Sequence, residues 1–317
     1  MTTYKGINGF GIQYLDSDPT NPITGQVWYN NTTKALKGAT PGVGAWSSGG
    51  ALNTARSQLA GAGTQTAGIV MGGDGGTPAD LASTELYNGS SWSISGNLNN
   101  ARTAFAGSGT QTAALAIGGV SADAVKTESF NGSSWTEVGN LNTGRPALYA
   151  VGTSTASLAF GGPAATESWN GFSWTSLNDL NTARSDLAGA GSTTAAVAYA
   201  GTGGLTLTEK FDGTNWTVAN VLPTGIAGGW GSGVQTNALL FGGQTPPAAK
   251  SAVTFIFDGT NWTTGANLGT AVAQPAGGVG GDGNTALQAG GSVASGYNAG
   301  TEEWTVSDFE TKTFTVS

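Results

Sequence analysis

Apolar and polar positions alternate along this chain in short runs that fit β-strands joined by tight turns. Residues 84–92 (TELYNGSSW) are typical: an alternating segment, an Asn-Gly pair, and a second segment that begins with tryptophan. Asn-Gly or Asp-Gly between two such segments predicts a β-hairpin, because these residues accept the positive φ angles of a type I′ turn. Copies of the segment begin at Thr127, Thr166, Thr208 and, more weakly, Thr254. The chain is therefore built from an internal repeat.

Three landmarks recur in a fixed order through the repeats. Each tryptophan is followed by a Leu-Asn-Thr-Ala-Arg box or a variant of it, and then by a Gly-Gly or Ala-Gly pair. The tryptophans lie 39 to 46 residues apart, at Trp46, Trp92, Trp135, Trp174, Trp216 and Trp262. This period is typical of the four-stranded blades of a β-propeller. In the first repeat we expect strands, from the inside outward, near residues 57–63, 66–72, 83–88 and 91–95.

The first 45 residues do not fit the repeat. We expect them to form a small leader module with a hairpin over residues 25–37 (GQVWYNNTTKALK), and residues 46–317 to form the propeller. Two ways of closing the ring remain open. In the first, which we favour, the strand at Trp46 pairs with the third strand of the last repeat, at residues 301–304, and closes a six-bladed ring. In the second, the last blade completes itself and the N-terminal hairpin builds a seventh blade.

Composition supports an all-β fold and excludes several kinds of chemistry. Among 317 residues there are 54 glycines, and neither cysteine nor histidine. The chain therefore lacks the groups for disulfides, cysteine nucleophiles, Cys/His zinc sites and histidine acid–base catalysis. A net charge of -8 disfavours nucleic acid and anionic membranes as partners. We find neither a signal peptide nor a long apolar run, and we expect no membrane insertion and no cofactor.

The repeat resembles the kelch family of β-propellers. The resemblance covers residues 46–317 and implies six blades of four antiparallel strands. It rests on the Glu-x-aromatic segment before each turn, the tryptophan five residues after that aromatic, and Gly-Gly at residues 72–73, 118–119, 161–162, 242–243 and 290–291. Galactose oxidase and its relatives in this family need histidines and a Tyr-Cys cross-link for their copper site. Because this chain has neither His nor Cys, that activity does not carry over.

The glycine-rich, weakly charged repeats look like those of kelch-like virion proteins of tailed bacteriophages. Residues 25–38 (GQVWYNNTTKALKG) look like the hairpin near the start of many phage tail-fibre proteins. This implies a non-enzymatic virion protein, made in the host cytoplasm, that joins other virion proteins through residues 1–45 in a homo-oligomeric or symmetric assembly and recognises a host-surface glycan. One alternative is a purely architectural decoration or fibre subunit. Another is a glycan-active enzyme that uses carboxylates alone.

Candidate ligand-binding residues come from the parts that differ between repeats. Most length variation falls between the Gly-Gly pair and the third strand, and the longest loops are residues 74–83, 244–253 and 292–300. Loops on a rigid scaffold often carry function. Two inner strands have an aromatic residue where others have alanine; these aromatics either line the channel mouth and stack on a sugar, or fill the axis. The predicted ligand-binding residues are Tyr149, Trp230, Asp74, Asp80, Gln244 and Lys250.

Residues that recur in strict register are expected to be structural. The boxes contain Arg56, Arg102, Arg145 and Arg184, which we expect to bond backbone carbonyls or Glu85, Glu128, Glu167 and Glu209 rather than a ligand anion. The tryptophans Trp92, Trp135, Trp174, Trp216 and Trp262 are expected to pack one blade on the next. Asp16, Asp18 and Asn21 have the chemistry of calcium ligands, but an Asx turn before proline explains them, so we predict no metal site.

Overall fold

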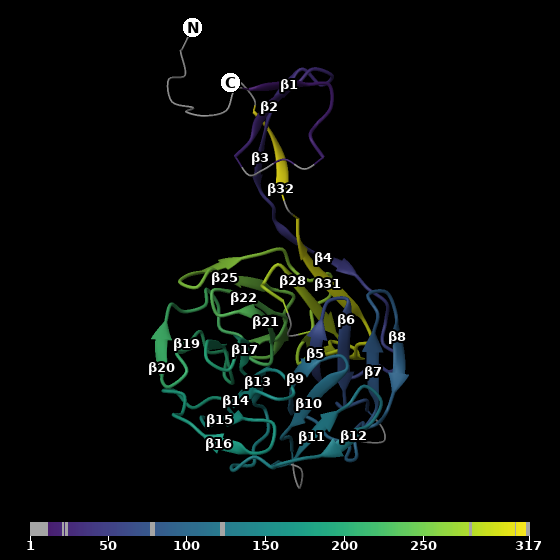
Figure 1. Cartoon of the computed structure of the whole chain (residues 1–317), viewed down its shortest axis with the longest axis vertical. Coiled ribbons are helices and arrows are strands. Elements are labelled where there is room, and N and C mark those ends of the chain that lie inside the picture. Colours follow the sequence, from purple (N-terminus) through teal and green to yellow (C-terminus); the bar gives the residue numbers. More distant parts are fainter. Residues whose placement is uncertain are drawn as a thin grey trace. The chain divides into compact units, whose positions relative to one another are not determined.

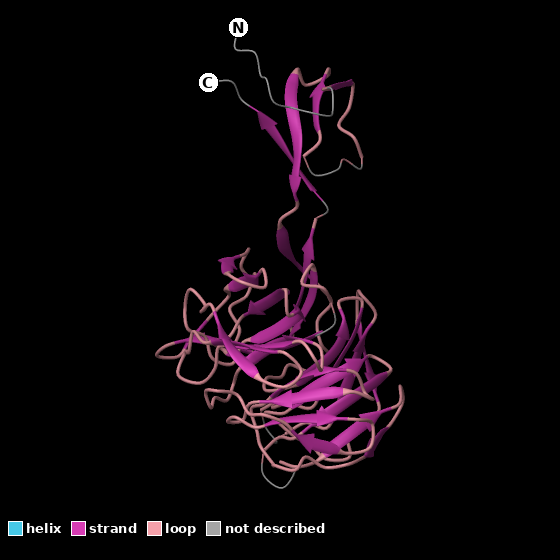
Figure 2. Cartoon of the chain, turned by 60° about the vertical axis from the view of Figure 1, so that its left-hand side comes forward, coloured by secondary structure: helices cyan, strands magenta, loops and turns pink. Residues whose placement is uncertain are grey.

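The computed structural model describes residues 12–20, 22, 25–76, 80–120, 124–278, 281–307 and 309–314. The chain divides into two compact units: residues 1–44 together with 306–317, and residues 45–305. The described residues form strands and loops (Figure 2). Among them there is no helix with the length and apolar character needed to cross a membrane.

Residues 45–305 contain six four-stranded sheets, which are the blades of a β-propeller. Blade 1 consists of β5 (Ala60–Thr64), β6 (Ala67–Met71), β7 (Thr84–Tyr87) and β8 (Trp92–Ser95); blade 2 of β9 (Ala106–Thr110), β10 (Ala113–Ile117), β11 (Thr127–Phe130) and β12 (Trp135–Glu137); blade 3 of β13 (Tyr149–Gly152), β14 (Ser157–Phe160), β15 (Thr166–Trp169) and β16 (Trp174–Ser176). Blade 4 consists of β17 (Ala188–Gly191), β18 (Ala196–Tyr199), β19 (Thr208–Phe211) and β20 (Trp216–Ala219), and blade 5 of β21 (Trp230–Val234), β22 (Asn237–Phe241), β25 (Thr254–Phe257) and β26 (Trp262–Thr264). In Figure 1 the inner strands β5, β9, β13, β17 and β21 surround the middle of this unit, and the outer strands β8, β12, β16 and β20 lie at its rim. The all-β propeller is confirmed, and the strands of blade 1 begin and end within about three residues of the expected positions.

The sixth blade draws its strands from both ends of the unit. It consists of β27 (Ala276–Gly278), β28 (Thr285–Ala289), β31 (Thr301–Val306) and β4 (Gly44–Ser48), in that order. The strand that carries Trp46 therefore completes the last blade beside β31, which is the six-bladed closure that we favoured. The hairpin over residues 25–37 belongs to the other unit and does not build a seventh blade.

The smaller unit is a four-stranded sheet of its own. Its strands are β1 (Gln13–Leu15), β2 (Val27–Asn30), β3 (Ala35–Pro41) and β32 (Phe309–Phe314), in that order. The β2–β3 hairpin is the one that the leader sequence predicts. The C-terminal boundary differs from our expectation, because residues 309–314 pair antiparallel with β3 instead of joining the propeller. The physical reason is that β4 already fills the outer position of blade 6, so β32 has no place there.

A tryptophan on the outer strand of each blade is bonded to the preceding blade. Its indole N–H donates to a threonine hydroxyl on the third strand of that blade, at 2.8–3.0 Å. The pairs are Trp92–Thr301, Trp135–Thr84, Trp174–Thr127, Trp216–Thr166, Trp262–Thr208 and Trp46–Thr254. The last pair uses β4, so the six bonds form a closed ring. These bonds explain why threonine precedes the glutamate in the repeated segment, a relation that the sequence did not reveal.

Candidate functional site

Six backbone segments meet around the propeller axis, one at the start of each inner strand. At each one an N–H donates to the carbonyl of the equivalent residue in the preceding blade, at 2.7–3.1 Å, and the last bond returns to the first residue. We call these residues the axial ring: Gln58, Ala104, Ala147, Asp186, Gly228 and Gln274. All six have φ between 51° and 59°. This left-handed conformation costs a residue other than glycine about 1–2 kcal/mol, and the closed set of hydrogen bonds holds it in place.

The axial ring surrounds the mouth of a pocket on the axis. The pocket offers about 60 Å³ to the centres of water-sized molecules, and the residues that follow the ring members form its walls. Its rim is not uniform. The polar ring side chains are Gln58, Asp186 and Gln274, whereas blades 2 and 3 contribute only Ala104 and Ala147. Around the ring, Gln58 and Gln274 are neighbours and Asp186 lies across from them, so hydrogen-bonding groups face each other over the mouth, and the arc at Ala104 and Ala147 is apolar.

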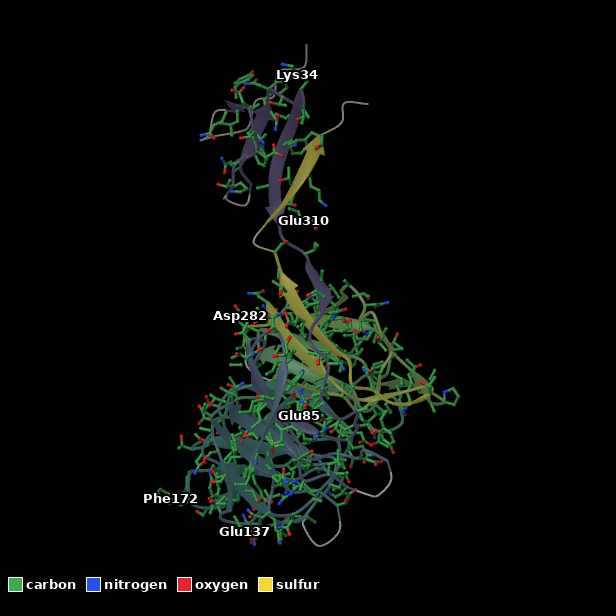
Figure 3. All side chains as sticks on the ribbon, turned by 90° about the vertical axis from the view of Figure 1, so that its right-hand side faces the viewer. Lys34, Glu85, Glu137, Phe172, Asp282 and Glu310 are labelled. Carbon is green, nitrogen blue, oxygen red and sulfur yellow. The ribbon has the colours of Figure 1, made fainter. Side chains whose placement is uncertain are left out.

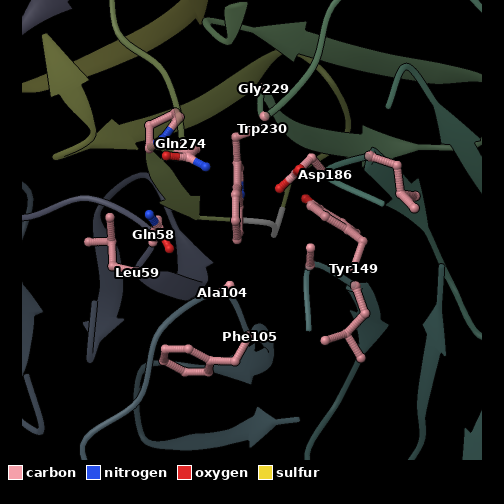
Figure 4. A pocket seen from close by; sticks show the side chains of 14 residues that line it. Gln58, Leu59, Ala104, Phe105, Tyr149, Asp186, Gly229, Trp230 and Gln274 are labelled. Carbon is pink, nitrogen blue, oxygen red and sulfur yellow. The ribbon is translucent and has the colours of Figure 1, made fainter. Parts of the chain in front are cut away.

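Tyr149 and Trp230, both predicted to bind ligand, lie in this pocket (Figure 4). Their ring centroids are 5.1 Å apart, and the two side chains are only 2% and 8% exposed. The Tyr149 hydroxyl donates to the Gly231 carbonyl at 2.7 Å, and burial raises the pKa of this tyrosine well above its usual value. Neither ring therefore offers an open face on which a sugar can stack. Both aromatics fill the axis, which is the second of the two roles that we considered for them.

Asp186 is the one acidic side chain among the residues that line the axial pocket. Burial raises its pKa, and a long hydrogen bond from Thr202 Oγ1, at 3.4 Å, opposes that shift. Sequence reasoning missed this residue. The available signal was the second position after each arginine box, where the six repeats read Gln, Ala, Ala, Asp, Gly and Gln.

The three longest loops lie on the neighbouring blades 5, 6 and 1 and bond to one another. Blade 5 carries the hairpin of β23 (Gln244–Thr245) and β24 (Ala249–Lys250), and blade 6 that of β29 (Ser292–Val293) and β30 (Gly296–Tyr297). Lys250 Nζ donates to Ser292 Oγ at 2.8 Å, and Tyr297 Oη to Asp74 Oδ2 at 2.9 Å. We call residues 244–250, 292–297, 74–76 and 80 the loop wall.

The loop wall is attached directly beside the axial ring. Isolated β-bridges join Asp74 to Ser57, Gln244 to Ala227, and Ser292 to Ala273. Each of these three partners immediately precedes a ring residue, namely Gln58, Gly228 and Gln274. The wall therefore rises next to the sector of the ring that contains two of its polar side chains.

The other four predicted ligand-binding residues lie in the loop wall. Asp74 and Lys250 are engaged in the bonds between loops, and the backbone of the exposed Asp80 bridges to Asp74. Gln244 lines a shallow cleft of about 120 Å³ together with Gly204 and residues 245–248. The structure thus divides the six predicted residues into two groups, one on the axis and one in the wall, and adds Gln58, Asp186 and Gln274 between them.

The four repeated arginines are enclosed within their blades. Each forms an ion pair with the glutamate of its own third strand: Arg56–Glu85 at 2.7 Å, Arg145–Glu167 and Arg184–Glu209 at 2.5 Å, and Arg102–Glu128. Arg56 also donates to the carbonyls of Gly72 and Ser83 at 3.0 and 2.9 Å. Because these guanidinium groups are buried and bonded on several sides, they hold the blade together and offer nothing to an external anion.

Asp18, one of the leader residues with the chemistry of a calcium ligand, is bonded to side chains of the leader itself. Asp18 accepts hydrogen bonds from Lys37 Nζ at 2.6 Å, Asn30 Nδ2 at 2.7 Å and Trp28 Nε1 at 2.9 Å. Asn21 lies outside the described residues. In the part of the chain that the structure describes, no three acidic side chains gather in a way that would hold a metal ion. Asp18 instead fastens the segment before the hairpin to β2 and β3.

This arrangement predicts how the smaller unit responds to acid. Hydrogen bonds from Lys37, Asn30 and Trp28, in that order, lower the pKa of Asp18 from 3.8 to about 2. A carboxylate with a depressed folded-state pKa adds stability that is fully present above pH 3.8 and is lost as the pH falls toward 2. In a ¹H–¹⁵N NMR titration the Trp28 indole signal should move with a midpoint near pH 2. Lys37→Met should raise that midpoint; an unchanged midpoint would contradict the assignment.

Comparison with known proteins agrees with the fold. No family model matches the chain, and no curated protein matches it in sequence. The solved structure of YjhT superposes with a TM-score of 0.68 at 12% sequence identity, covering 83% of this chain and 99% of that one. At this level of identity the likeness is one of fold. The chain is thus a β-propeller protein, with six blades closed by β4.

Proposed function

We propose that this chain is a non-enzymatic virion protein of a tailed bacteriophage whose propeller binds a host-surface glycan. The observation that carries the proposal is the asymmetry of one propeller face. Its three longest loops are bonded into a single wall beside the axial ring, while the Arg-Glu pairs of blades 1 to 4 and the outer-strand tryptophans of blades 1 to 5 are buried. A face built this way has one sector that differs from the rest of a repeating scaffold, which is where recognition is expected.

The chemistry of this face suits a sugar better than a charged polymer. It presents amides at Gln58, Gln244 and Gln274 and carboxylates at Asp74 and Asp186. Side-chain amides both donate and accept hydrogen bonds and carboxylates accept them, so together these groups can bond sugar hydroxyls. An acidic protein of net charge -8 is a poor partner for polyanions such as nucleic acid.

The smaller unit is the part that we assign to attachment. The phage resemblance falls on residues 25–38, which include β2 and the first half of β3 in the hairpin of this unit. This unit exposes four large apolar side chains, two on strands of its sheet, Tyr14 and Phe314, and two beside them in the chain, Ile12 and Val43. Several exposed apolar groups on so small a unit favour contact with another protein. We therefore place the partner, another virion protein in a symmetric or homo-oligomeric assembly, at this sheet.

Two observations argue against a carboxylate-only hydrolase. Such enzymes use two carboxyl groups about 5–9.5 Å apart that flank the scissile bond. Among the residues that line the axial pocket, Asp186 is the only acid, and Asp74 in the wall is bonded to Tyr297 and to the Gly76 N–H. The purely architectural alternative makes no use of the loop wall, so experiment distinguishes it directly.

The test replaces residues 244–253, the whole connection from the Gly-Gly pair to β25, with the equivalent short connection of blade 3, residues 163–165. Binding of the purified protein to host cells and to an array of host-type glycans should fall at least about tenfold. Phe172→Ser is the matched control, because Phe172, 85% exposed on the turn between β15 and β16 (Figure 3), stands where blades 1 and 2 have serine. The Phe172→Ser variant should leave binding unchanged.

Wild-type protein that binds neither cells nor glycans would refute the recognition role and favour the architectural one.

The virion setting needs its own measurement. Mass spectrometry of purified particles should detect the chain, and deletion of residues 1–44 with 306–317 should remove it from the particles while the propeller still accumulates in the host. If particles contained no copy of the chain, the virion assignment would fail whatever the glycan result.

A further inference from the structure

Three side chains at the mouth of the axial pocket have hydrogen-bonding capacity that the protein does not use. In the described part of the chain, the side-chain amides of Gln58 and Gln274 have no hydrogen-bond partner, and Asp186 receives only the 3.4 Å bond from Thr202. The repeated glutamates show the contrast, since Glu85 accepts bonds from Arg56 and from the N–H groups of Asn53 and Thr54. Half-buried polar groups that stay unsatisfied on a rigid backbone are typical of a ligand site.

The identity of these side chains is not set by the ring itself. Alanine occupies two of the six ring positions and glycine a third, with the same backbone conformation and the same hydrogen bonds. Alanine would therefore serve the backbone equally well at Gln58, Asp186 and Gln274. In Figure 4 the Trp230 ring lies at the middle of the pocket, with Gln58 and Gln274 on one side and Asp186 on the other. Polar groups thus lie on both sides of the Trp230 ring, which Figure 4 shows edge-on.

We infer that the axial pocket is the subsite for one uncharged sugar at the end of the glycan, with Asp186 accepting hydrogen bonds from its hydroxyls and Gln58 and Gln274 donating to and accepting from them. This inference rests on the proposed glycan-binding function. The volume supports the entry of one edge of a sugar ring rather than the whole ring, because 60 Å³ for water-sized centres holds roughly four waters. The remainder of the glycan extends over the apolar side at Ala104 and Ala147 or along the loop wall.

Charge makes the subsite selective. None of the residues that line the pocket is a lysine or an arginine, and the one ionisable acid at the mouth is Asp186. A sugar carboxylate placed beside Asp186 would meet a like charge without a compensating cation, in a partly desolvated setting that strengthens the repulsion. A neutral hexose meets acceptors and donors only. The subsite is therefore expected to bind neutral sugars and to reject uronic acids.

The test follows the indole signals of ¹⁵N-tryptophan-labelled protein, with Trp230 assigned through Trp230→Phe. The probes are methyl glycosides of glucose, galactose and mannose, the methyl glycoside of glucuronic acid, and the oligosaccharide that binds best on the array. At least one neutral glycoside should move the Trp230 signal. The glucuronic acid glycoside should need a concentration at least about tenfold higher to move it equally far. Asp186→Asn should weaken the neutral ligand about tenfold and narrow its advantage over glucuronoside.

Gln274→Ala provides a second variant, because alanine already occupies this ring position in blades 2 and 3, and it should also weaken binding. Asp212→Asn is the matched control: it removes one carboxylate from blade 4, at a turn where blades 1 to 3 have asparagine, and should leave glycan binding unchanged.

If the array oligosaccharide binds but both pocket variants bind it normally and the Trp230 signal stays fixed, the subsite is wrong and glycan binding lies elsewhere. If calcium chloride alone moves that signal and no glycoside does, the pocket holds a cation instead. If wild-type protein binds no glycan at all, the proposed function fails and the subsite fails with it.

Discussion

Glu128→Ala is expected to lower the free energy of unfolding by about 3–5 kcal/mol. Glu128 is fully buried, pairs with Arg102, and accepts the backbone N–H of Asn99 at 2.7 Å. Removing the carboxylate leaves a guanidinium in the blade interior without its counter-charge and leaves a backbone donor without an acceptor. Most of the loss is the cost of these stranded groups, rather than the net value of the ion pair.

Blade 5 shows which replacement the fold tolerates. There Ile226 stands in place of the arginine and Phe255 in place of the glutamate, and both belong to one buried apolar cluster. Pro223 stands where the boxes of blades 1 to 4 have asparagine, so the N–H that the glutamate would accept is absent as well. Blade 5 therefore lacks the backbone donor, the carboxylate acceptor and both charges of the ion pair at the same time. The triple replacement Asn99→Pro, Arg102→Ile and Glu128→Phe should therefore cost less stability than Glu128→Ala alone.

Urea unfolding followed by tryptophan fluorescence measures these differences. Glu137→Gln is the control in the same blade, since the Lys126–Glu137 pair is at the surface, with its closest atoms 3.7 Å apart, and should change stability by less than about 1 kcal/mol. A loss for Glu128→Ala no larger than that of the control would mean that the repeated Arg-Glu pairs do not hold the blades together. If the triple variant were less stable than Glu128→Ala, the proline, isoleucine and phenylalanine of blade 5 would depend on other residues of that blade.

The sequence predicted those parts of the fold that depend on local, repeated signals. The Asn/Asp-Gly turns and the fixed distance from tryptophan to arginine box locate the strands, because each signal acts within one blade. Ring closure depends on β4 and β31, which are more than 250 residues apart. Nothing in the local pattern of residues 44–48 distinguishes a strand of blade 6 from one of a seventh blade. For the same reason β32 was assigned to the propeller although it pairs with β3.

The candidate site was predictable only where it departs from the repeat. Tyr149 and Trp230 stand out because they replace alanine on inner strands, and the loop wall because its loops are long. Asp186 and its neighbours in the axial ring differ from blade to blade in the sequence. Their common feature, a left-handed residue bonded to its equivalents in adjacent blades, exists only after six distant segments come together. The sequence alone therefore does not show which of its variable positions face the axis.

A chain that begins at Gly49 is expected to lose the cooperative unfolding transition of the propeller. Such a chain lacks β4, so the edge of β31 is unpaired and the ring of tryptophan–threonine bonds is open at Trp46. Trp46 also packs against Phe241 and Trp304, with ring centroids 5.0 and 5.5 Å away. Loss of one such aromatic costs about 3–5 kcal/mol, which is much of the 5–15 kcal/mol that stabilises a typical domain. Circular dichroism during thermal unfolding should show a broad, low-temperature transition.

A permuted chain separates the role of β4 from that of the smaller unit. It runs from Gly49 to Trp304, continues through an Asn-Gly-Ser-Ser turn copied from residues 88–91, and ends with residues 46–48. This chain gives blade 6 the same order of third strand, turn and fourth strand as blade 1, with the same turn sequence, and it lacks the sheet that contains β3 and β32. The permuted chain should recover a sharp transition because its closing strand is present. If it unfolded like the truncated chain, the pairing of β3 with β32, which brings the two ends of the chain together, would be what keeps the ring closed.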